Sequence, residues 1–244
     1  MSDVTAEMLR RLLLDAGLGP GMRILDVGCG HGKVSALAAE LVGDEGSVVA
    51  FDREADRVEF AREHRRHANI EFVAATIDSF EWNEPFDAAI GRRVLMYQAD
   101  PVAAVKRLAS HVRPGGVVAF QEIDVSMPPL SSAPLPLHVQ VRDWIWDALP
   151  KETPRDFGFD LYRVFTQAGL QPDVRAEALV HTPTTDHPLA DVVRWMLPKL
   201  VASGVDAEDV DIDTLDARLT AERAENDATY IDQLVFGVWA RLAA

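Results

Sequence analysis

The sequence contains little cysteine and no long apolar run. Its single cysteine, Cys29, excludes a framework of internal disulfide bonds and any metal site built on paired cysteines. No apolar stretch approaches the ~18 residues of a membrane-spanning helix, and acidic residues near the N-terminus are atypical of a signal peptide. We therefore expect a cytoplasmic protein with no membrane partner and no bound metal.

Positive charge is also scarce. The chain has 24 Lys and Arg residues against 39 Asp and Glu residues, which gives a formal net charge of -15. Proteins that bind nucleic acid gain much of their affinity from basic residues that neutralise phosphates, so this balance disfavours a nucleic-acid partner. The most basic stretch, residues 53–66, interleaves glutamates with arginines at helical spacings, which is typical of a solvated helix face.

Apolar segments alternate along the chain with segments of helical periodicity. With 244 residues, 48% of them hydrophobic, the chain can bury one sizeable core. Strands are expected at residues 22–27, 47–51, 70–74, 86–91, 117–121, 172–184 and 231–242. Helices are expected at residues 5–18, 33–43, 55–67, 101–112, 139–149, 159–170, 188–204 and 214–225. This order predicts a doubly wound α/β fold with a seven-stranded, mostly parallel sheet.

The alternation stops after Asp124, where four prolines at positions 128, 129, 134 and 136 predict an irregular excursion. We expect helical cap insertions after the fifth and sixth strands, at residues 126–160 and 182–228. The core then comprises residues 1–125, 161–181 and 229–244. Ligands of open α/β sheets bind outside the carboxyl ends of the strands, so the caps are expected to cover that edge and to select the molecule that binds there.

Three glycines follow the first expected strand, in the stretch RILDVGCGHGKV at residues 23–34. A P-loop would need a glycine at position 27 and a serine or threonine at position 34, but both positions hold valine. A dinucleotide fingerprint would need a third glycine where Lys33 stands. Asp52 ends the next strand, where a carboxylate can accept both hydroxyls of a ribose. The pattern indicates a cofactor that contains a nucleoside and requires no phosphates.

Five segments resemble the motifs of class I S-adenosylmethionine-dependent methyltransferases: LDVGCGHG, FDRE, FVAATIDSF, GRRVLMYQADP and LASHVRPGGVVAF. The resemblance is close over residues 5–125 and looser over the final strand. It implies that S-adenosylmethionine is the cofactor and S-adenosylhomocysteine the product. The cofactor-binding residues that it implies are Asp26, Gly28, Cys29, Gly30, Asp52, Arg53, Thr76, Ile77 and Arg92. Of these, Thr76 replaces an acid that often binds the adenine amino group.

The fourth segment, GRRVLMYQADP, also indicates which class of molecule accepts the methyl group. Enzymes that methylate nitrogen in nucleic acids or protein amides usually carry an Asn- or Asp-Pro-Pro-aromatic sequence there, whereas this chain has GRRVLMY. Together with the acidic charge, this favours a small-molecule acceptor. The segment is similar to bacterial enzymes that methylate ubiquinone-type rings and secondary metabolites. A homodimer is the assembly we consider.

A methyl transfer of this kind needs acceptor, methyl carbon and sulfur in line, and it needs a general base only when the acceptor must lose a proton. The candidate bases are Glu122 and His138. The candidate substrate contacts are Tyr97, Gln121, Trp144 and Trp195. Two other interpretations stay open at this point: an NAD(P)-dependent oxidoreductase and a non-catalytic assembly domain that keeps the methyltransferase fold.

Overall fold

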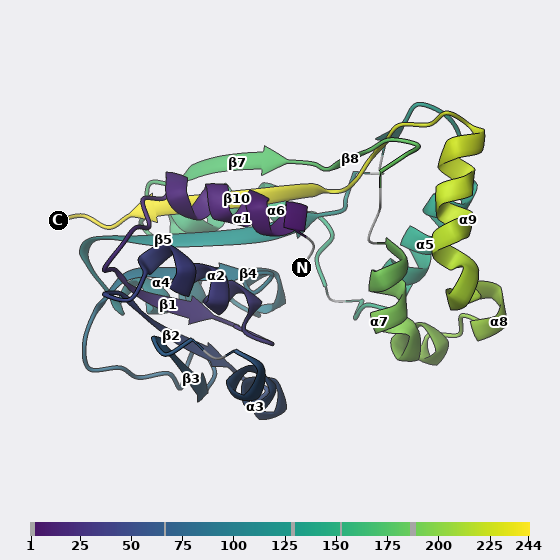
Figure 1. The fold of residues 1–244 in the computed structure, drawn as a ribbon. Helices are drawn as coiled ribbons and strands as arrows, with labels where there is room; N and C mark the ends of the chain where they lie inside the picture. Colours follow the sequence, from purple (N-terminus) through teal and green to yellow (C-terminus); the bar gives the residue numbers. More distant parts are fainter. Residues whose placement is uncertain (1–2, 66, 128–129, 152, 186–188) are drawn as a thin grey trace. The chain divides into compact units, whose positions relative to one another are not determined.

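The computed structural model describes residues 3–65, 67–127, 130–151, 153–185 and 189–244, so Pro128 and Pro129 lie outside the described residues. The chain divides into two compact units (Figure 1). Unit 1 comprises Met1–Asp124, Asp156–Glu177 and Val235–Ala244, and unit 2 comprises Val125–Arg155 and Ala178–Leu234.

Unit 1 is built on a seven-stranded sheet with the order β3-β2-β1-β4-β5-β10-β7 (Figure 1). Its strands are β1 (Arg23–Val27), β2 (Ser47–Asp52), β3 (Ile70–Ala74), β4 (Phe86–Arg92), β5 (Val112–Asp124), β7 (Asp173–Glu177) and β10 (Leu234–Arg241). The five strands from β3 to β5 pair in parallel, and β10 is antiparallel to β7. The predicted fold class is therefore confirmed.

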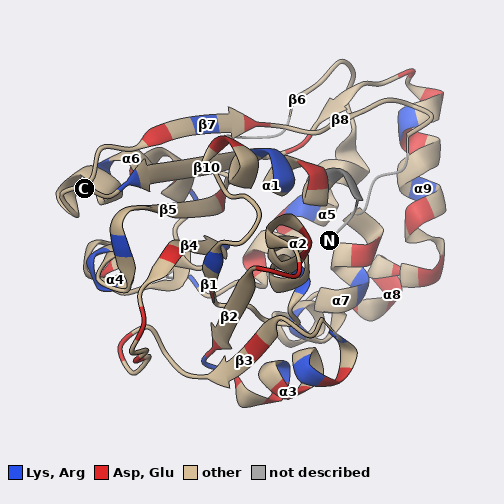
Figure 2. Cartoon of the chain, turned by 60° about the vertical axis from the view of Figure 1, so that its left-hand side comes forward, with Lys and Arg blue, Asp and Glu red and all other residues tan. Residues whose placement is uncertain are grey.

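The helices of unit 1 are α1 (Asp3–Asp15), α2 (Lys33–Val42), α3 (Ala55–His64), the 3-10 turn η1 (Leu95–Tyr97), α4 (Pro101–Ala109) and α6 (Phe157–Gln167). Local sequence sets their ends: the Asp100 carboxylate accepts the Ala103 N–H at the start of α4, and α2 stops at Gly43. Basic and acidic positions are interleaved along α3 (Figure 2).

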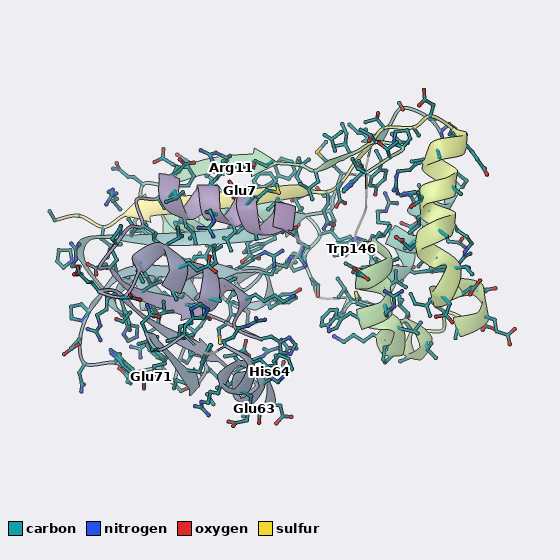
Figure 3. The ribbon with its side chains drawn as sticks, in the orientation of Figure 1. Glu7, Arg11, Glu63, His64, Glu71 and Trp146 are labelled. Atoms are coloured by element: carbon teal, nitrogen blue, oxygen red, sulfur yellow. The ribbon has the colours of Figure 1, made fainter. Side chains whose placement is uncertain are left out.

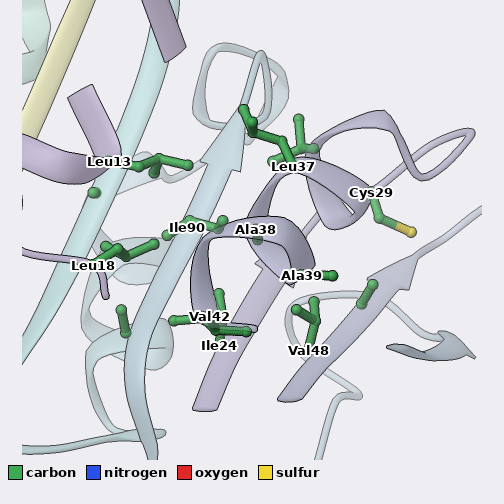
Figure 4. Packing of buried hydrophobic residues seen from close by; sticks show 14 of the residues in the cluster. Leu13, Leu18, Ile24, Cys29, Leu37, Ala38, Ala39, Val42, Val48 and Ile90 are labelled. Atoms are coloured by element: carbon green, nitrogen blue, oxygen red, sulfur yellow. The ribbon is translucent and has the colours of Figure 1, made fainter. Parts of the chain in front are cut away.

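One face of the sheet buries α2 against the central strands (Figure 4). Leu37 and Val42 of α2 pack in one cluster with Ile24 of β1, Val48 of β2 and Ile90 of β4. Each of these side chains is at most 5% exposed. At about 25 cal/mol per Å² of apolar surface, this packing holds β1 and β4 side by side and so fixes where their carboxyl ends lie.

Unit 2 contains the helices α5 (Pro136–Asp147), α7 (Leu189–Ala202), α8 (Ala207–Val210) and α9 (Ile212–Glu225). Its small core includes Val141 of α5, Val193 and Leu200 of α7, and Leu215 and Leu219 of α9. It also holds a three-stranded sheet of β6 (Leu130–Ser131), β9 (Tyr230–Ile231) and β8 (Val180–His181). The sequence did not predict this sheet, because strands of two residues show no alternation of apolar and polar side chains.

The bounds of the units differ from the sequence-based ranges at four places. Val125 and residues 229–234 fall in unit 2, although the sequence-based ranges put them in the core. Residues 156–160 belong to unit 1, because α6 begins at Phe157, and residues 178–181 belong to unit 2, because they lead into β8. Among the described residues, no helix has both the length and the hydropathy to cross a membrane.

Candidate active site

The loop after β1 has the backbone conformation that its glycines permit. Gly28, Gly30 and Gly32 have φ angles of 63°, 51° and 72°, a region that other residues rarely adopt. A Cβ atom at position 28 would lie 2.7 Å from Val94 Cγ2, so only glycine fits beneath that side chain. At position 30 no described atom lies within 4 Å of the Cβ position. The loop therefore leaves open space at Gly30 for a ligand to approach the backbone.

Asp52 links the ends of β1 and β2. Its Oδ2 accepts the Gly30 N–H at 2.8 Å, and its Oδ1 accepts the Glu54 N–H at 3.0 Å. The side chain is 6% exposed. Two backbone donors therefore fix the carboxylate at the carboxyl edge of the sheet, while each oxygen keeps a further lone pair for a ligand hydroxyl.

Asp26 is buried one residue before the end of β1. Its Oδ2 accepts the Ser35 hydroxyl at 2.6 Å, whereas its Oδ1 is buried and has no hydrogen-bond partner among the described residues. Burial raises the pKa of this carboxyl to about 7, the Ser35 hydrogen bond opposes the rise, and the Asp52 charge adds to it. An unpaired buried acceptor is costly, so Asp26 is a group that a cationic or N–H-bearing ligand would satisfy.

Glu122, near the end of β5, is fully buried and supports the segment after β4. Its Oε1 accepts the N–H groups of Val94 and Leu95 at 2.9 and 2.8 Å. In the part of the chain that the structure describes, its Oε2 is buried without a hydrogen-bond partner. Burial raises the pKa of Glu122 to about 7 in spite of those two hydrogen bonds and the nearby Arg93 and Arg92. In this geometry Glu122 orients the turn that carries Tyr97.

Tyr97 and Gln121 lie at the same edge. Tyr97, in η1, is 46% exposed, and burial of its hydroxyl raises its pKa, while Arg93 opposes that rise. Gln121 is buried, and its Oε1 accepts the Arg92 Nε–H at 3.1 Å. The structure thus brings together Tyr97, Gln121, Glu122 and Arg92, which the sequence assigned to different roles.

The remaining cofactor candidates surround the ends of β1, β2 and β3. Cys29 is buried, and burial raises the pKa of its thiol, which makes it a poor nucleophile. Arg53 is exposed, Ile77 is buried, and Thr76 is exposed with its hydroxyl bonded to Ser79. None of these placements tests a contact with the cofactor, so these assignments stay predictions.

The candidates in unit 2 have a different environment. His138 has no exposed surface; its Nδ1 lies 2.7 Å from Glu222 Oε2, and its Nε2 lies 3.0 Å from Arg223 Nη1. Both ring nitrogens are therefore engaged within unit 2. Trp144 is half-buried against the small apolar core, whereas Trp195 is 66% exposed. Their roles as base and as acceptor contacts stay predictions.

Sequence reasoning missed the partners of the buried acids. Ser35 lies nine residues beyond Asp26, and Glu122 reaches the Val94 N–H across 28 residues of chain. The change from apolar to polar residues before Glu122 indicated a candidate functional residue at the end of the strand. No local pattern indicates which backbone N–H groups its carboxylate accepts. Sequence reasoning also missed a cation–π contact of Trp146, which is labelled in Figure 3. The guanidinium carbon of Arg155 lies 5.9 Å from the centre of the Trp146 ring.

The curated proteins that share sequence with this chain include two O-methyltransferases. The ubiquinone biosynthesis O-methyltransferase of Cereibacter sphaeroides is 29% identical over 172 residues, 68% of this chain and 66% of that protein. The malonyl-(acyl-carrier protein) O-methyltransferase of Acetivibrio thermocellus is 30% identical over 108 residues, 44% of this chain and 38% of that protein. The chain thus spans between 38% and 66% of the length of these two relatives.

A comparison of structures concerns the fold alone. A SAM-dependent methyltransferase from Aquifex aeolicus matches 100% of this chain and 100% of its own, with a TM-score of 0.57 and 15% sequence identity. Residues 18–167, which carry the glycine loop, Asp52 and the β4–β5 edge, match the methyltransferase domain family. The chain therefore belongs to the class I S-adenosylmethionine-dependent methyltransferases.

Proposed function

We propose that this enzyme transfers a methyl group from S-adenosylmethionine to a small molecule by in-line displacement, and that the cofactor binds at the carboxyl edge of β1, β2 and β4. The observation that carries the proposal is the Asp52 carboxylate fixed by the Gly30 and Glu54 N–H groups, beside open space at Gly30. S-adenosylmethionine supplies a methyl group already activated on a sulfonium.

The residues present fit that cofactor. Asp52 has lone pairs available for the two ribose hydroxyls, as a sheltered carboxylate at this position should. The unpaired Oδ1 of Asp26 can accept hydrogen bonds from an ammonium group such as that of the methionine moiety. Gly28, Cys29 and Gly30 would border that moiety. The adenine would lie near the cofactor candidates at the ends of β2 and β3: Arg53, Thr76 and Ile77.

The acceptor is a small molecule in this proposal. The net charge of -15 disfavours a nucleic-acid substrate, and the segment GRRVLMY lacks the motif typical of amide and base methylation. One relative is named as an O-methyltransferase of ubiquinone biosynthesis, which supports a small acceptor with an oxygen nucleophile. The other is named as a malonyl-(acyl-carrier protein) O-methyltransferase, which supports the oxygen nucleophile alone. Holding the acceptor, methyl carbon and sulfur in line can lower the activation free energy by on the order of 7 to 11 kcal/mol.

The cap is part of the same proposal. Unit 2 leaves unit 1 after Asp124 of β5 and after Glu177 of β7. Leu242, just beyond β10, donates its N–H to the Gly116 carbonyl, so β10 is antiparallel to β5 as well as to β7, and β7 runs parallel to β5. Both exits therefore lie at the carboxyl edge of the sheet, which supports a role of Trp144 and Trp195 in selecting the acceptor.

A general base is required only for an acceptor that must lose a proton. Glu122 is the candidate in unit 1, because its Oε2 is unpaired and its pKa of about 7 suits proton transfer at neutral pH. Because Glu122 is fully buried, a base role needs the side chains around it to open a path to the acceptor. His138 is the second candidate, although both of its ring nitrogens already have partners.

Isothermal titration calorimetry tests the proposal. We expect S-adenosylmethionine and S-adenosylhomocysteine to bind with one site per chain in the presence of EDTA, and NAD not to bind. Binding of NAD without S-adenosylhomocysteine would favour an oxidoreductase. Binding of none of the three would favour a non-catalytic domain.

A further inference from the structure

Arg92 is a partly buried cation at the carboxyl end of β4. Its Nε donates to Gln121 Oε1 at 3.1 Å, and Gln121 is 3% exposed. Within the described ranges of the chain, Arg92 makes no ion pair and its Nη groups have no hydrogen-bond partner. Cations withdrawn from water in proteins are normally paired, so this arrangement leaves donors that a ligand can use.

The position of Arg92 places it at the reaction edge. Gly91 pairs with Val27 in the register of β4 and β1, so Arg92 lies one residue beyond the point where β1 gives way to the glycine loop. The next residue, Arg93, has a φ of 56°, which a residue other than glycine adopts only at a cost. Strain of this kind clusters where a side chain must be held for function.

The charges that face Arg92 do not neutralise it. Arg93 is a second cation, and Glu122 is the acid close enough to oppose the effect of burial, which lowers the pKa of Arg92 to about 9. Glu122, however, already accepts two backbone N–H groups and is itself protonated for part of the time at neutral pH. The acid that faces Arg92 is thus incompletely charged at neutral pH.

We propose that Arg92 binds a carboxylate carried by the acceptor, with Gln121 holding the guanidinium in place. The proposal rests on the proposed function and narrows its substrate class to acidic small molecules. A guanidinium matches a carboxylate with two parallel N–H···O bonds, which gives both orientation and affinity. The bond from Gln121 fixes Nε and so leaves the Nη groups to make that contact.

The sequence motifs imply instead that Arg92 binds the cofactor, whose α-carboxylate would offer the same chemistry. The proposal departs from that assignment, and the experiment distinguishes the two sources of the carboxylate. Calorimetry is performed on the protein saturated with S-adenosylhomocysteine. The probes are three acids, benzoate, 3,4-dihydroxybenzoate and hexanoate, each compared with its own neutral amide. We expect at least one acid to bind about ten-fold or more tightly than its amide, the effect of a charge-assisted hydrogen bond.

Two variants complete the design. Arg92→Gln removes the cation and should abolish the preference for acid over amide, while S-adenosylhomocysteine affinity stays within about three-fold. Arg113→Gln is the matched control, because Arg113 lies at the start of β5, pairs with Asp87, and should keep the preference. The comparison of each acid with its amide is made on the unmodified protein. It therefore tests the proposal even if the Arg92→Gln variant does not fold.

Equal affinity for every acid and its amide, or no binding of any acid, overturns the proposal. Loss of S-adenosylhomocysteine affinity in Arg92→Gln with the acid preference intact also overturns it, because Arg92 would then hold the cofactor. Failure of the unmodified protein to bind S-adenosylhomocysteine at all would instead overturn the proposed function, and so the two failures are distinguishable.

Discussion

Unit 1 buries a parallel sheet under helices that mostly follow each strand directly in the sequence, whereas unit 2 assembles its helices from two stretches separated by residues 156–177. In unit 1 the buried acids Asp26, Asp52 and Glu122 lie at strand ends and keep unpaired atoms or lone pairs. In unit 2 the buried polar group His138 has partners on both ring nitrogens. Unit 2 also holds a buried atom without a partner among the described residues, Arg218 Nε, so the difference lies in the kind and place of the group. In unit 1 the buried acids with unpaired atoms or free lone pairs gather at the carboxyl ends of neighbouring strands, where the proposed cofactor would bind.

The Glu222 carboxylate shows how unit 2 joins its two stretches. It accepts the N–H groups of Leu137 and His138 at the start of α5, 2.7 and 3.1 Å away, and also the His138 side chain. Arg223 donates to the Thr185 carbonyl from the next position on α9. These polar contacts join α5 to α9, beside the apolar core and the pairing of β6 with β9 that also connect the two stretches of unit 2.

The largest effect is expected from His138→Leu. The substitution leaves Glu222 and Arg223 without their shared partner inside unit 2, and it should lower the free energy of unfolding by about 2 to 4 kcal/mol. Urea unfolding measures this loss. If His138→Leu keeps its stability but loses methyl transfer, His138 does not stabilise unit 2 and acts instead as a catalytic base.

Asp52→Ala should weaken S-adenosylhomocysteine binding by roughly 10- to 100-fold, because a sheltered charge-assisted contact is worth about 1.5 to 3 kcal/mol. Calorimetry measures the affinity. Asp52→Asn is the matched variant, since its amide oxygen can still accept the Gly30 N–H while the charge is lost; we expect an intermediate affinity. Full affinity in a folded Asp52→Ala protein would show that the ribose binds elsewhere.

Glu122→Gln should change how stability depends on pH. Because burial raises the pKa of Glu122 from 4.5 to about 7, the folded state binds more protons than the unfolded state across that window. The stability of the unmodified protein therefore falls as pH rises from about 4.5 to 7. Asp26 contributes to the same window.

The glutamine variant cannot ionise, so it should gain about 2 kcal/mol relative to the unmodified protein between pH 5 and pH 8. Urea unfolding at several pH values checks this. Parallel stability profiles would show that Glu122 ionises normally. The rate of methyl transfer separates the two possible roles of Glu122. If Glu122 is a base, the Glu122→Gln variant should lose activity. If Glu122 only orients the η1 turn, Glu122→Gln should keep activity and Glu122→Ala should lose it.

The smallest effect is expected from Trp195→Ala. Trp195 is 66% exposed, so its removal should change the free energy of unfolding by less than about 0.5 kcal/mol. If Trp195 contacts the acceptor, the KM for the acceptor should rise several-fold while S-adenosylhomocysteine affinity is unchanged. Normal kinetics in Trp195→Ala and in Trp144→Ala would place acceptor selection in unit 1, near Tyr97.

The parts of this molecule that could be predicted are those whose signal is local in sequence. Short motifs indicate the glycines after β1 and the acid that ends β2, and the central strands β1, β2 and β4 of unit 1 are apolar enough to be recognised singly. The sheet of β6, β8 and β9 has strands of two residues and gives no such signal. The contact of Glu222 with His138 joins positions 84 residues apart, which no spacing rule connects.

The most direct measurement for the central claim is amide hydrogen exchange with and without S-adenosylhomocysteine. The account predicts slower exchange in residues 28–33 and 52–54, because the cofactor covers the glycine loop and the donors that hold Asp52. A matched peptide at residues 110–116, at the opposite edge of the sheet, should exchange at the same rate in both states. Unchanged exchange at residues 28–33 under saturating S-adenosylhomocysteine would contradict the placement of the active site in unit 1.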